Sequence, residues 1–583
     1  MEDDCMRTEY GHPRPDFRRE QWMSLNGTWE FAFGKEGVSP DYSQNIQVPF
    51  VYQSEASGIE SRGKHDIIWY RREFDLTALG PGKRYLLHFG AVDYYTQVWI
   101  NGKYVGDHKG GYTPFSFDIT KMLQQRNQII VRVEDRYADT SQIRGKQMWQ
   151  QQEYGCWYAG YSGIWQSVWL ESVPEHYIKN FRITPDIEKK QMEMSVEVSG
   201  YDLDTIIYAK VSCRGKELAE ISCRCMECRI SFSVSVNNPS ADMNGIFLWT
   251  PETPDLYDIQ LELRSKEEMQ DIVYTYYGMR TIQRHGDKVL LNNLPYYQKL
   301  ILNQGYYPGG YITAQSDEDY RRDIRLIKEM GFNGVRMHQK IEDPRFLYWC
   351  DVMGLIVWEE MPSLYDFNTE AQLQFIWELY AVVERDYNHP CIAVWVAYNE
   401  SWGVFDLFHS KEQQAAVQAA YYLFKSLDQT RLVIGNDGWE HTATDLCTIH
   451  DYEQNAEVMH KVYQDRQCVT DKVPSKMFPR YIQAQGFAYD GQPVIVSEFA
   501  GIAFEKNEGW GYGAGAKNIE EYKERLSGLI AAVRSKDYIC GYCITQFTDV
   551  EHEQNGLLCF DRTPKLPAEE ICQMQKRSLI EMK

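Results

Sequence analysis

The stretch Ile392–Trp402 reads I-A-V-W-V-A-Y-N-E-S-W and decides the fold of the carboxy-terminal half of the chain. From Ile392 to Tyr398 it is apolar or aromatic without polar alternation, which is typical of a parallel strand covered on both faces. It then ends abruptly in Asn399 and Glu400. α/β barrels carry their chemistry at the carboxyl ends of such strands. Taken alone, Glu400 could equally cap the next helix, so a second acid must decide.

The second acid is Glu498, which ends the buried run P-V-I-V-S-E-F at residues 493–499. We expect eight such strands, with room for a helix after each, at residues 300–303, 334–338, 355–359, 392–399, 432–436, 448–452, 494–498 and 542–547. This repeat predicts a (β/α)8 TIM barrel over residues 284–583. The ends of its fourth and seventh strands face each other across the barrel mouth, which brings Glu400 and Glu498 together.

The first half of the chain predicts two β domains. Residues 1–173 contain short strands with turn signals, including Asn101-Gly102 inside Q-V-W-I-N-G-K-Y-V, and are typical of a jelly-roll β-sandwich. Residues 174–283 contain further strands at the spacing of an immunoglobulin-like β-sandwich. Neither segment shows a catalytic constellation, so we expect both to support the barrel.

The composition of the chain narrows the range of partners that it can bind. The 583 residues carry a formal charge of -22, which argues against a nucleic-acid or anionic-membrane partner. The 41 Tyr and 16 Trp suit either sugar-binding platforms or sandwich cores. No apolar run approaches the length of a membrane span, and the start M-E-D-D lacks the features of a signal peptide, so we expect a cytoplasmic protein. The 14 Cys are then expected as reduced thiols, and Cys223, Cys225 and Cys228 as packing residues rather than metal ligands.

Two carboxyl groups about 5 to 5.5 Å apart are the apparatus of a retaining glycosidase. One attacks the anomeric carbon, and the other protonates the leaving oxygen and later deprotonates water. The alternative is a metal site, for which neighbouring strand ends offer Glu359, Glu360, His338 and His450. We expect neither a metal nor another cofactor.

The sequence also resembles the family 2 glycoside hydrolases, which include β-galactosidases, β-glucuronidases and β-mannosidases. The similar segments extend over almost the whole chain: S-L-N-G-T-W-E-F, V-W-I-N-G-K-Y-V-G, Y-S-G-I-W-Q-S-V-W-L-E, G-F-N-G-V-R, H-P-C-I-A-V-W-V-A-Y-N-E-S-W and P-V-I-V-S-E-F. The resemblance implies that Glu400 is the acid/base and Glu498 the nucleophile. It also implies that Asn399 holds the sugar 2-hydroxyl and that Tyr452 hydrogen-bonds the nucleophile.

Further residues at strand ends are candidates for the wall of the sugar site, namely Trp402, Asp437, Trp439, His338 and Gln546. His338 and Gln546 replace residues that are common in the family. The loop at residues 507–518, which follows the nucleophile strand and is rich in Gly, is expected to shape one wall of the cleft. For catalysis, Glu498 must be ionised, and we expect Glu400 to be protonated in the free enzyme.

The sugar is less defined than the chemistry. The Asn-x-Lys motif with which β-glucuronidases of the family grip a carboxylate is missing from the tail D-V-E-H-E-Q-N-G-L-L (residues 549–558). Arg336 and Lys340 are the nearest alternative cations. We therefore expect an exo-acting enzyme for neutral β-glycosides or oligosaccharides, with β-galactosides first. A β-glucuronidase or β-galacturonidase remains the alternative, as does an inactive carbohydrate-binding protein. The oligomeric state, including a homo-oligomer, stays open.

Overall fold

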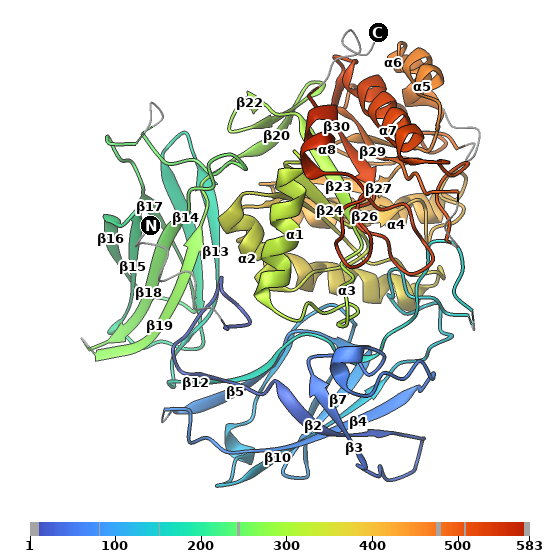
Figure 1. Ribbon diagram of the computed structural model, residues 1–583. Helices are drawn as coiled ribbons and strands as arrows, with labels where there is room; N and C mark the ends of the chain where they lie inside the picture. The colour runs from blue at the N-terminus through green and yellow to red at the C-terminus, as the bar shows by residue number, and fades with distance from the viewer. Residues whose placement is uncertain are drawn as a thin grey trace.

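The computed structural model describes residues 11–80, 82–150, 152–241, 245–266, 268–473, 480–505 and 509–576. Three bodies follow one another along the chain (Figure 1). A β-sandwich in blue lies beneath a barrel in yellow to red, and a second sandwich in green packs at the side of the barrel. The predicted fold class, two β-sandwiches followed by a (β/α)8 barrel, is confirmed.

The eight predicted parallel strands form one sheet in the order β27-β26-β25-β24-β23-β30-β29-β28. Every residue of β26 (Ile392–Asn399) is buried, as its apolar run predicted. The outermost strands of the sheet meet where His450 N donates to Gly438 O at 3.3 Å. The strands are β23 (Gln298–Asn303), β24 (Gly334–Met337), β25 (Ile356–Glu360), β26 (Ile392–Asn399), β27 (Leu432–Asp437), β28 (Cys447–Asp451), β29 (Val494–Ala500) and β30 (Ile539–Thr545).

Most of the described barrel helices begin at polar caps, with α8 (Ala568–Met574) as an exception that follows Pro567. Asp317–Glu329 starts with a capping box in which Ser316 and Asp319 satisfy each other's backbone N–H groups. No helix in the described parts of the chain has the length and apolar character needed to cross a membrane. The helices are α1 (Asp317–Glu329), α2 (Pro344–Met353), α3 (Thr369–Asp386), α4 (Lys411–Leu427), α5 (Ala456–Val462), α6 (Arg466–Asp471), α7 (Ile519–Arg534) and α8 (Ala568–Met574).

The amino-terminal sandwich has two main sheets, ordered β3-β2-β4-β10-β7-β8 and β1-β12-β5-β9, with a small β11-β6 pair. The strand Asn127–Glu134 alternates buried and half-buried residues because one face packs on the core, whereas Val168–Val173 is buried throughout. At the predicted hairpin, Asn101 and Gly102 adopt φ values of 51° and 74°, as a type I′ turn requires. The strands are β1 (Trp22–Ser24), β2 (Gly27–Phe33), β3 (Gln44–Val48), β4 (Ile67–Phe74), β5 (Arg84–Phe89), β6 (Val92–Asp93), β7 (Tyr95–Ile100), β8 (Lys103–Lys109), β9 (Phe115–Asp118), β10 (Asn127–Glu134), β11 (Gly163–Ile164) and β12 (Val168–Val173).

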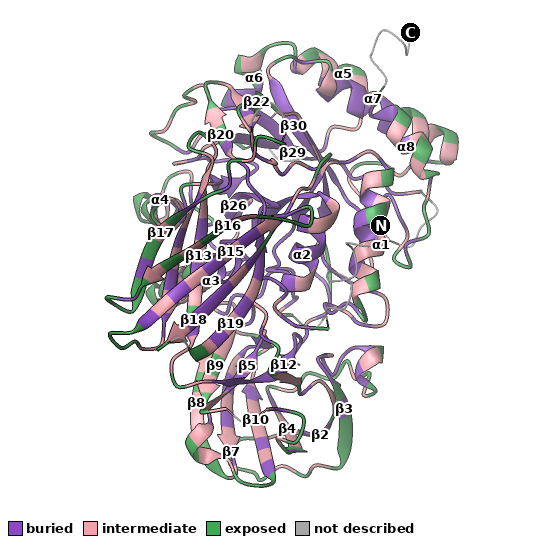
Figure 2. Cartoon of the chain, turned by 90° about the vertical axis from the view of Figure 1, so that its left-hand side faces the viewer, coloured by how far each residue is buried: buried purple, intermediate pink, exposed green. Residues whose placement is uncertain are grey.

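The second sandwich has a three-stranded sheet, β13-β14-β17, facing a four-stranded sheet, β16-β15-β18-β19. Three short strands, β20 (Ile282–His285), β21 (Lys288–Leu291) and β22 (Leu294–Pro295), then lead into the barrel. The sandwich strands are β13 (Ile178–Asp186), β14 (Gln191–Val198), β15 (Thr205–Cys213), β16 (Lys216–Arg224), β17 (Arg229–Ser235), β18 (Tyr257–Ser265) and β19 (Glu268–Tyr277). Figure 2 shows continuous burial in the barrel strands and alternating burial in the sandwich strands.

One segment of the amino-terminal sandwich leaves its own domain. The described residues of the segment between β10 and β11, 135–150 and 152–162, include a stretch that lies against the barrel, where the N–H groups of Arg144 and Gly145 donate to Ser363 O at 3.0 Å. A Cβ at Gly145 would stand 2.4 Å from Gln339 O, so only glycine allows this close approach. The sandwich therefore does more than support the barrel from below, because this segment reaches the carboxyl ends of the barrel strands.

Candidate active site

The two predicted glutamates meet at the barrel mouth. Glu400 directly follows β26, and its φ of 52° turns the chain sharply out of the strand. Glu498 lies within β29. One carboxylate oxygen of each, together with a ring nitrogen of His450, lie within 4.8 Å of one another. So close an approach of two oxygens fits the roughly 5 to 5.5 Å between the carboxyl groups of retaining glycosidases better than the roughly 6.5 to 9.5 Å of inverting ones.

Two donors hold the carboxylate of Glu498. The Tyr452 hydroxyl donates to its Oε2 at 2.6 Å, and Arg336 Nη1 donates to its Oε1 at 2.6 Å. Burial raises the pKa of Glu498, but the charges of His450 and Arg336 outweigh burial and lower the pKa below its ordinary value. Glu498 is therefore ionised at neutral pH, as a nucleophile requires.

Arg336 organises the floor of the site. Its guanidinium is fully buried and forms ion pairs with Glu360 at 2.7 Å and Asp437 at 3.0 Å in addition to Glu498. Its Nη2 also donates to Asn399 Oδ1 at 2.7 Å. The described residues place no acceptor on Asn399 Nδ2, which is therefore available as a donor to a sugar hydroxyl. The fork of one arginine thus fixes both the nucleophile and the neighbouring amide.

Glu400 is paired with His450, whose position at a strand end indicated only a candidate metal ligand. Nδ1 of His450 lies 2.8 Å from Glu400 Oε1, and Trp402 Nε1 donates to Oε2 at 3.3 Å. Burial would raise the pKa of Glu400, but the hydrogen bond and charge of His450 lower it. Burial lowers the pKa of His450, whereas Glu498, Asp437 and Glu400 raise it to about 10. These opposite shifts favour the proton on His450 over Glu400, where we expected it in the free enzyme.

The other predicted wall residues lie at different depths. Trp402 packs edge-on against Trp157 with ring centroids 4.9 Å apart and stands beside Glu400. Trp439 lies edge-on to His450 at 5.6 Å. Asp437 is fully buried and accepts from Ser497 Oγ at 2.8 Å, so it braces Arg336 from behind instead of facing the sugar.

The last two predicted wall residues are also engaged with the protein. The ring of His338 lies 3.2 Å from Glu360, beneath the site. Gln546 is fully buried, accepts from Gln304 at 2.8 Å and donates to Asn555 at 2.8 Å. Gln546 therefore supports the loop after β30 from behind.

Two further segments complete the walls. Within the 507–518 loop, residues 507 and 508 lie outside the described residues, but Tyr512 stacks on Tyr452 with ring centroids 3.6 Å apart. From the sandwich, Trp157 Nε1 donates to the Tyr365 hydroxyl at 2.7 Å, and the Tyr158 hydroxyl donates to Glu553 Oε2 at 2.6 Å. Trp157 and Tyr158 belong to no motif that is recognisable in the sequence. The high Tyr and Trp content of the chain was the one indication that aromatic side chains could line a sugar site.

The predicted cations for an acidic sugar are both occupied. Arg336 serves the ion pairs described above. Nζ of Lys340 is buried, donates to the carbonyls of Gly305 and Ile312 and pairs with Glu342 at 2.5 Å. Neither side chain is free to bind a substrate carboxylate.

The residues at the mouth suit hydrogen bonding better than metal binding. Glu400, His450 and Glu498 could surround an ion by distance alone. However, His450 presents an N–H to Glu400, and donors already occupy both oxygens of Glu498. A cation would have to displace Arg336 and a proton. These contacts are in line with an acid/base and nucleophile pair that works without a metal.

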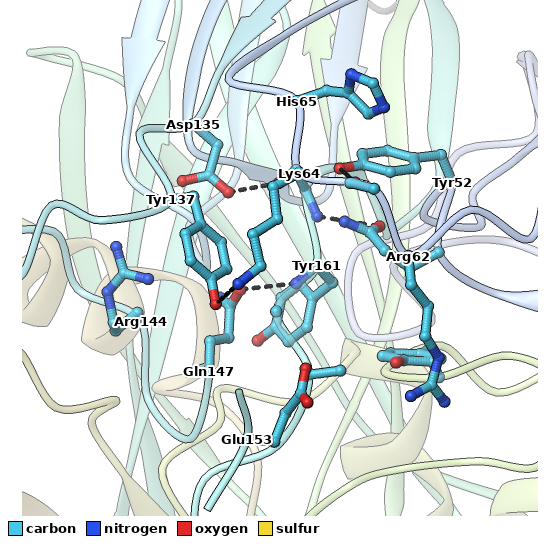
Figure 3. Close-up of a pocket in the computed structure, with 16 residues that line it drawn as sticks. Tyr52, Arg62, Lys64, His65, Asp135, Tyr137, Arg144, Gln147, Glu153 and Tyr161 are labelled. Carbon is cyan, nitrogen blue, oxygen red and sulfur yellow. Dashed lines mark hydrogen bonds between the residues drawn. The ribbon is translucent and has the colours of Figure 1, made fainter. Parts of the chain in front are cut away.

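A neighbouring pocket of the sandwich is separate from this site. Figure 3 shows Lys64 directed at Tyr137 among a lining that includes Tyr52, Asp135 and Tyr161. Nζ of Lys64 donates to Gln150 O at 2.6 Å. The pocket contains neither catalytic glutamate, and its volume of about 30 Å³ accommodates water but no sugar ring.

Three family models match consecutive parts of the chain. They describe the sugar binding domain of glycosyl hydrolases family 2 at residues 38–174, a further family 2 domain at residues 176–280 and the family 2 TIM barrel domain at residues 311–578.

Known proteins with similar sequences or structures carry several names. A β-galactosidase of Thermoanaerobacter pseudethanolicus is 30% identical over 371 residues, which is 60% of this chain but only 47% of that protein. A β-glucuronidase of Rattus norvegicus is 22% identical over 627 residues, covering 96% of this chain and 88% of its own. The structure of a β-galacturonidase from Eisenbergiella tayi bound to galacturonate has a TM-score of 0.76 at 21% identity, covering 97% and 100%.

The similarity to the solved β-galacturonidase structure shows the fold of this chain. The names of the similar proteins state different sugars. The chain spans less than half the length of the first curated relatives that it matches. The three consecutive family models and the shared three-part architecture nevertheless agree over nearly all of the chain. The chain therefore belongs to glycosyl hydrolase family 2.

Proposed function

We propose that this chain is a retaining exo-β-glycosidase that hydrolyses terminal β-linked neutral sugars, with β-galactosides as the first candidates. The observation that carries the proposal is the close approach of two carboxylates of unlike environment, within 4.8 Å of each other and of His450. Glu498 is held ionised by Arg336 and Tyr452, while Glu400 shares a proton with His450. Such a pair suits double displacement.

In the first step, Glu498 attacks the anomeric carbon while the glycosidic bond breaks. The leaving oxygen takes a proton from Glu400, which receives it from His450 Nδ1. Because Glu498 is the largest of the charges that raise the pKa of His450, loss of its negative charge on glycosylation makes His450 more acidic. Formation of the covalent intermediate therefore drives the proton toward the leaving group.

In the second step, Glu400 acts as base. It removes a proton from water, whose oxygen attacks the anomeric carbon and releases Glu498 as carboxylate. The returning charge raises the pKa of His450 again, and the proton passes back from Glu400 to Nδ1. Asn399 Nδ2 is placed to donate to the sugar 2-hydroxyl, a contact that strengthens in the transition state.

The walls support exo action on a neutral sugar. Beyond the glutamates, the sandwich segment and the loop after β30 close on each other where Tyr158 meets Glu553 at 2.6 Å. This closure favours a pocket for one terminal sugar over an open groove. In place of an Asn-x-Lys motif that loop has acidic Glu553 and neutral Asn555, and Arg336 and Lys340 are engaged elsewhere.

The test is hydrolysis of a panel of nitrophenyl β-glycosides, with neutral and uronic sugars side by side, followed by NMR of the first anomer released. We expect turnover of a neutral β-glycoside, with β-galactoside foremost, and a β anomer as the first product. Preference for a uronide would replace the neutral sugar by the β-glucuronidase or β-galacturonidase alternative. No turnover on any member, with binding of sugar, would indicate a carbohydrate-binding protein.

A further inference from the structure

The sandwich places a lysine in the catalytic pocket. Lys146 O accepts from the N–H of Tyr158 at 2.9 Å, and the preceding Gly145 O accepts from the Tyr365 hydroxyl at 2.7 Å. Lys146 therefore lies between Tyr158, which reaches Glu553, and Trp157, which packs on Trp402 beside Glu400. Its fixed backbone delivers an ammonium group from one domain into the site of another.

Among the described residues, this ammonium has no carboxylate at ion-pair distance. Lys146 is only 8% exposed, and no described carboxylate oxygen lies within 4.0 Å of its Nζ. Burial lowers its pKa, while Cys156, Glu553, Tyr365 and Glu498 raise it above the ordinary value, and the Cys156 thiol is a hydrogen-bond partner of the ammonium. Burial raises the pKa of Glu553 above its ordinary value, and the charge of Lys146 opposes that rise. Because a thiol is a weak partner, the buried ammonium keeps N–H donors that a ligand can satisfy.

Glu553 is the acidic counterpart of this lysine. It is 2% exposed, and its two oxygens accept from Tyr158 at 2.6 Å and from Asn555 at 3.1 Å. Asn555 is in turn fixed by Gln546. Glu553 is thus held by neutral donors and retains lone pairs for a further donor.

We propose that Lys146 and Glu553 form the specificity-determining pair of this enzyme and grip hydroxyl groups of a neutral terminal sugar. The inference rests on the proposed function and names its substrate class. The ammonium and the carboxylate are too far apart for an ion pair, and a sugar hydroxyl can accept from one and donate to the other. A uronate is disfavoured because its carboxylate would meet Glu553, Glu498 and Glu400 in one buried pocket.

Steady-state kinetics of Lys146→Met and Glu553→Gln on the best neutral nitrophenyl β-glycoside test the pair. Lys64→Met is the matched control, because Lys64 belongs to the same sandwich and points into the separate pocket of Figure 3. We expect each site variant to lower kcat/KM by about 10- to 100-fold, as for loss of a hydrogen bond to a charged group. The control should keep the wild-type kcat/KM. The ratio of uronide to neutral-sugar turnover should rise in Glu553→Gln.

Melting temperatures accompany the kinetics, and Lys146→Gln replaces Lys146→Met if the latter does not fold. Near-wild-type kcat/KM in both site variants would overturn the pair. The pair would also be overturned if the wild type preferred uronides and Lys146→Met abolished that preference, because Lys146 would then bind the sugar carboxylate. The proposal that the chain is a glycosidase would stand in that case. A wild-type protein that cleaves no β-glycoside would instead contradict the proposed function itself.

Discussion

Two buried histidine–carboxylate clusters in this barrel have the same chemistry and different surroundings. In one, His450 lies 2.8 Å from Glu400 at the carboxyl ends of the strands. In the other, His389 lies 2.5 Å from Asp351, between the barrel and the second sandwich. The side chains of His389 and Asp351 are fully buried, whereas that of Glu400 is 15% exposed.

The difference lies in how tightly each carboxylate is held and in its exposure. Asp351 accepts from the N–H of Cys391 at 2.8 Å and from the Tyr276 hydroxyl at 2.7 Å, in addition to its contact with His389. Glu400 has a φ of 52° directly after its strand, and its contacts with the Tyr452 hydroxyl and Trp402 Nε1 are both long, at 3.3 Å. A tightly held and fully buried carboxylate suits a contact between domains, whereas a loosely held and partly exposed one at a strand end can act on a substrate.

The largest effect on activity is expected from Glu498→Gln. Gln cannot form the glycosyl ester, so kcat/KM on a nitrophenyl β-glycoside should fall by about 10⁴-fold or more. The melting temperature should stay close to that of the wild type, because the single amide oxygen of Gln can still accept from one of the two donors and Arg336 keeps its ion pairs with Glu360 and Asp437. Activity within tenfold of the wild type would remove Glu498 from the nucleophile role.

Glu400→Gln comes next and separates the two steps. Substrates with poor leaving groups should lose about 10² to 10⁴-fold in kcat, because no group protonates the leaving oxygen. Activated aryl glycosides need no acid, and azide should restore their turnover by replacing water as the attacking group. A folded variant whose rate does not respond to azide would argue against the acid/base role.

His450→Gln should act mainly through pH. The raised pKa of His450, about 10, means that the pair with Glu400 keeps its proton until the pH rises past that value. Without His450 the proton must remain on Glu400 alone, so the alkaline limb of kcat/KM should move down by at least about one pH unit. An alkaline limb at the wild-type position would show that the pair does not share the catalytic proton.

His389→Gln provides the contrast, with the smallest effect on activity. Removing one partner of a buried ion pair should lower the free energy of unfolding by about 3 to 5 kcal/mol, measured by denaturant titration. The folded variant should keep the wild-type kcat/KM.

In the wild type, His389 has a raised pKa: burial lowers it, and the charge of Asp351 more than offsets burial. Its stabilising contribution is therefore full below about pH 6.5 and fades as the pH rises through the folded-state pKa. A loss of kcat/KM without loss of stability would erase the contrast.

Local sequence was sufficient for the barrel and for the central residues of its mouth. The alternation of strand-like and helix-like segments predicted all eight strands, and the unbroken apolar run at residues 392–398 indicated a parallel strand buried on both faces. Acids at the ends of the fourth and seventh strands predicted that Glu400 and Glu498 meet, since a closed barrel places those ends together. The family resemblance predicted that Tyr452, which follows the sixth strand, hydrogen-bonds Glu498, and its hydroxyl donates to Oε2 at 2.6 Å.

The other features of the site depend on contacts between segments that are far apart in the sequence, which local patterns do not reveal. His450 carried a polar signal at a strand end, but its partner is set by the bend at Glu400, which periodicity does not encode. Lys146 lies in an irregular segment of a domain expected only to support the barrel, and its approach depends on the close packing of Gly145 against Gln339. Asp437 was predicted to face the sugar and instead lies behind Arg336, since strand alternation does not set depth below the mouth.

Covalent trapping tests the central claim most directly. A 2-deoxy-2-fluoro β-glycoside of the preferred sugar, with an activated leaving group, should inactivate the enzyme by slowing hydrolysis of the intermediate more than its formation. Peptide mass spectrometry should then place one fluorosugar on the peptide that contains Glu498. A label on any other residue, or turnover of the parent substrate with inversion and no label, would contradict the two-glutamate mechanism.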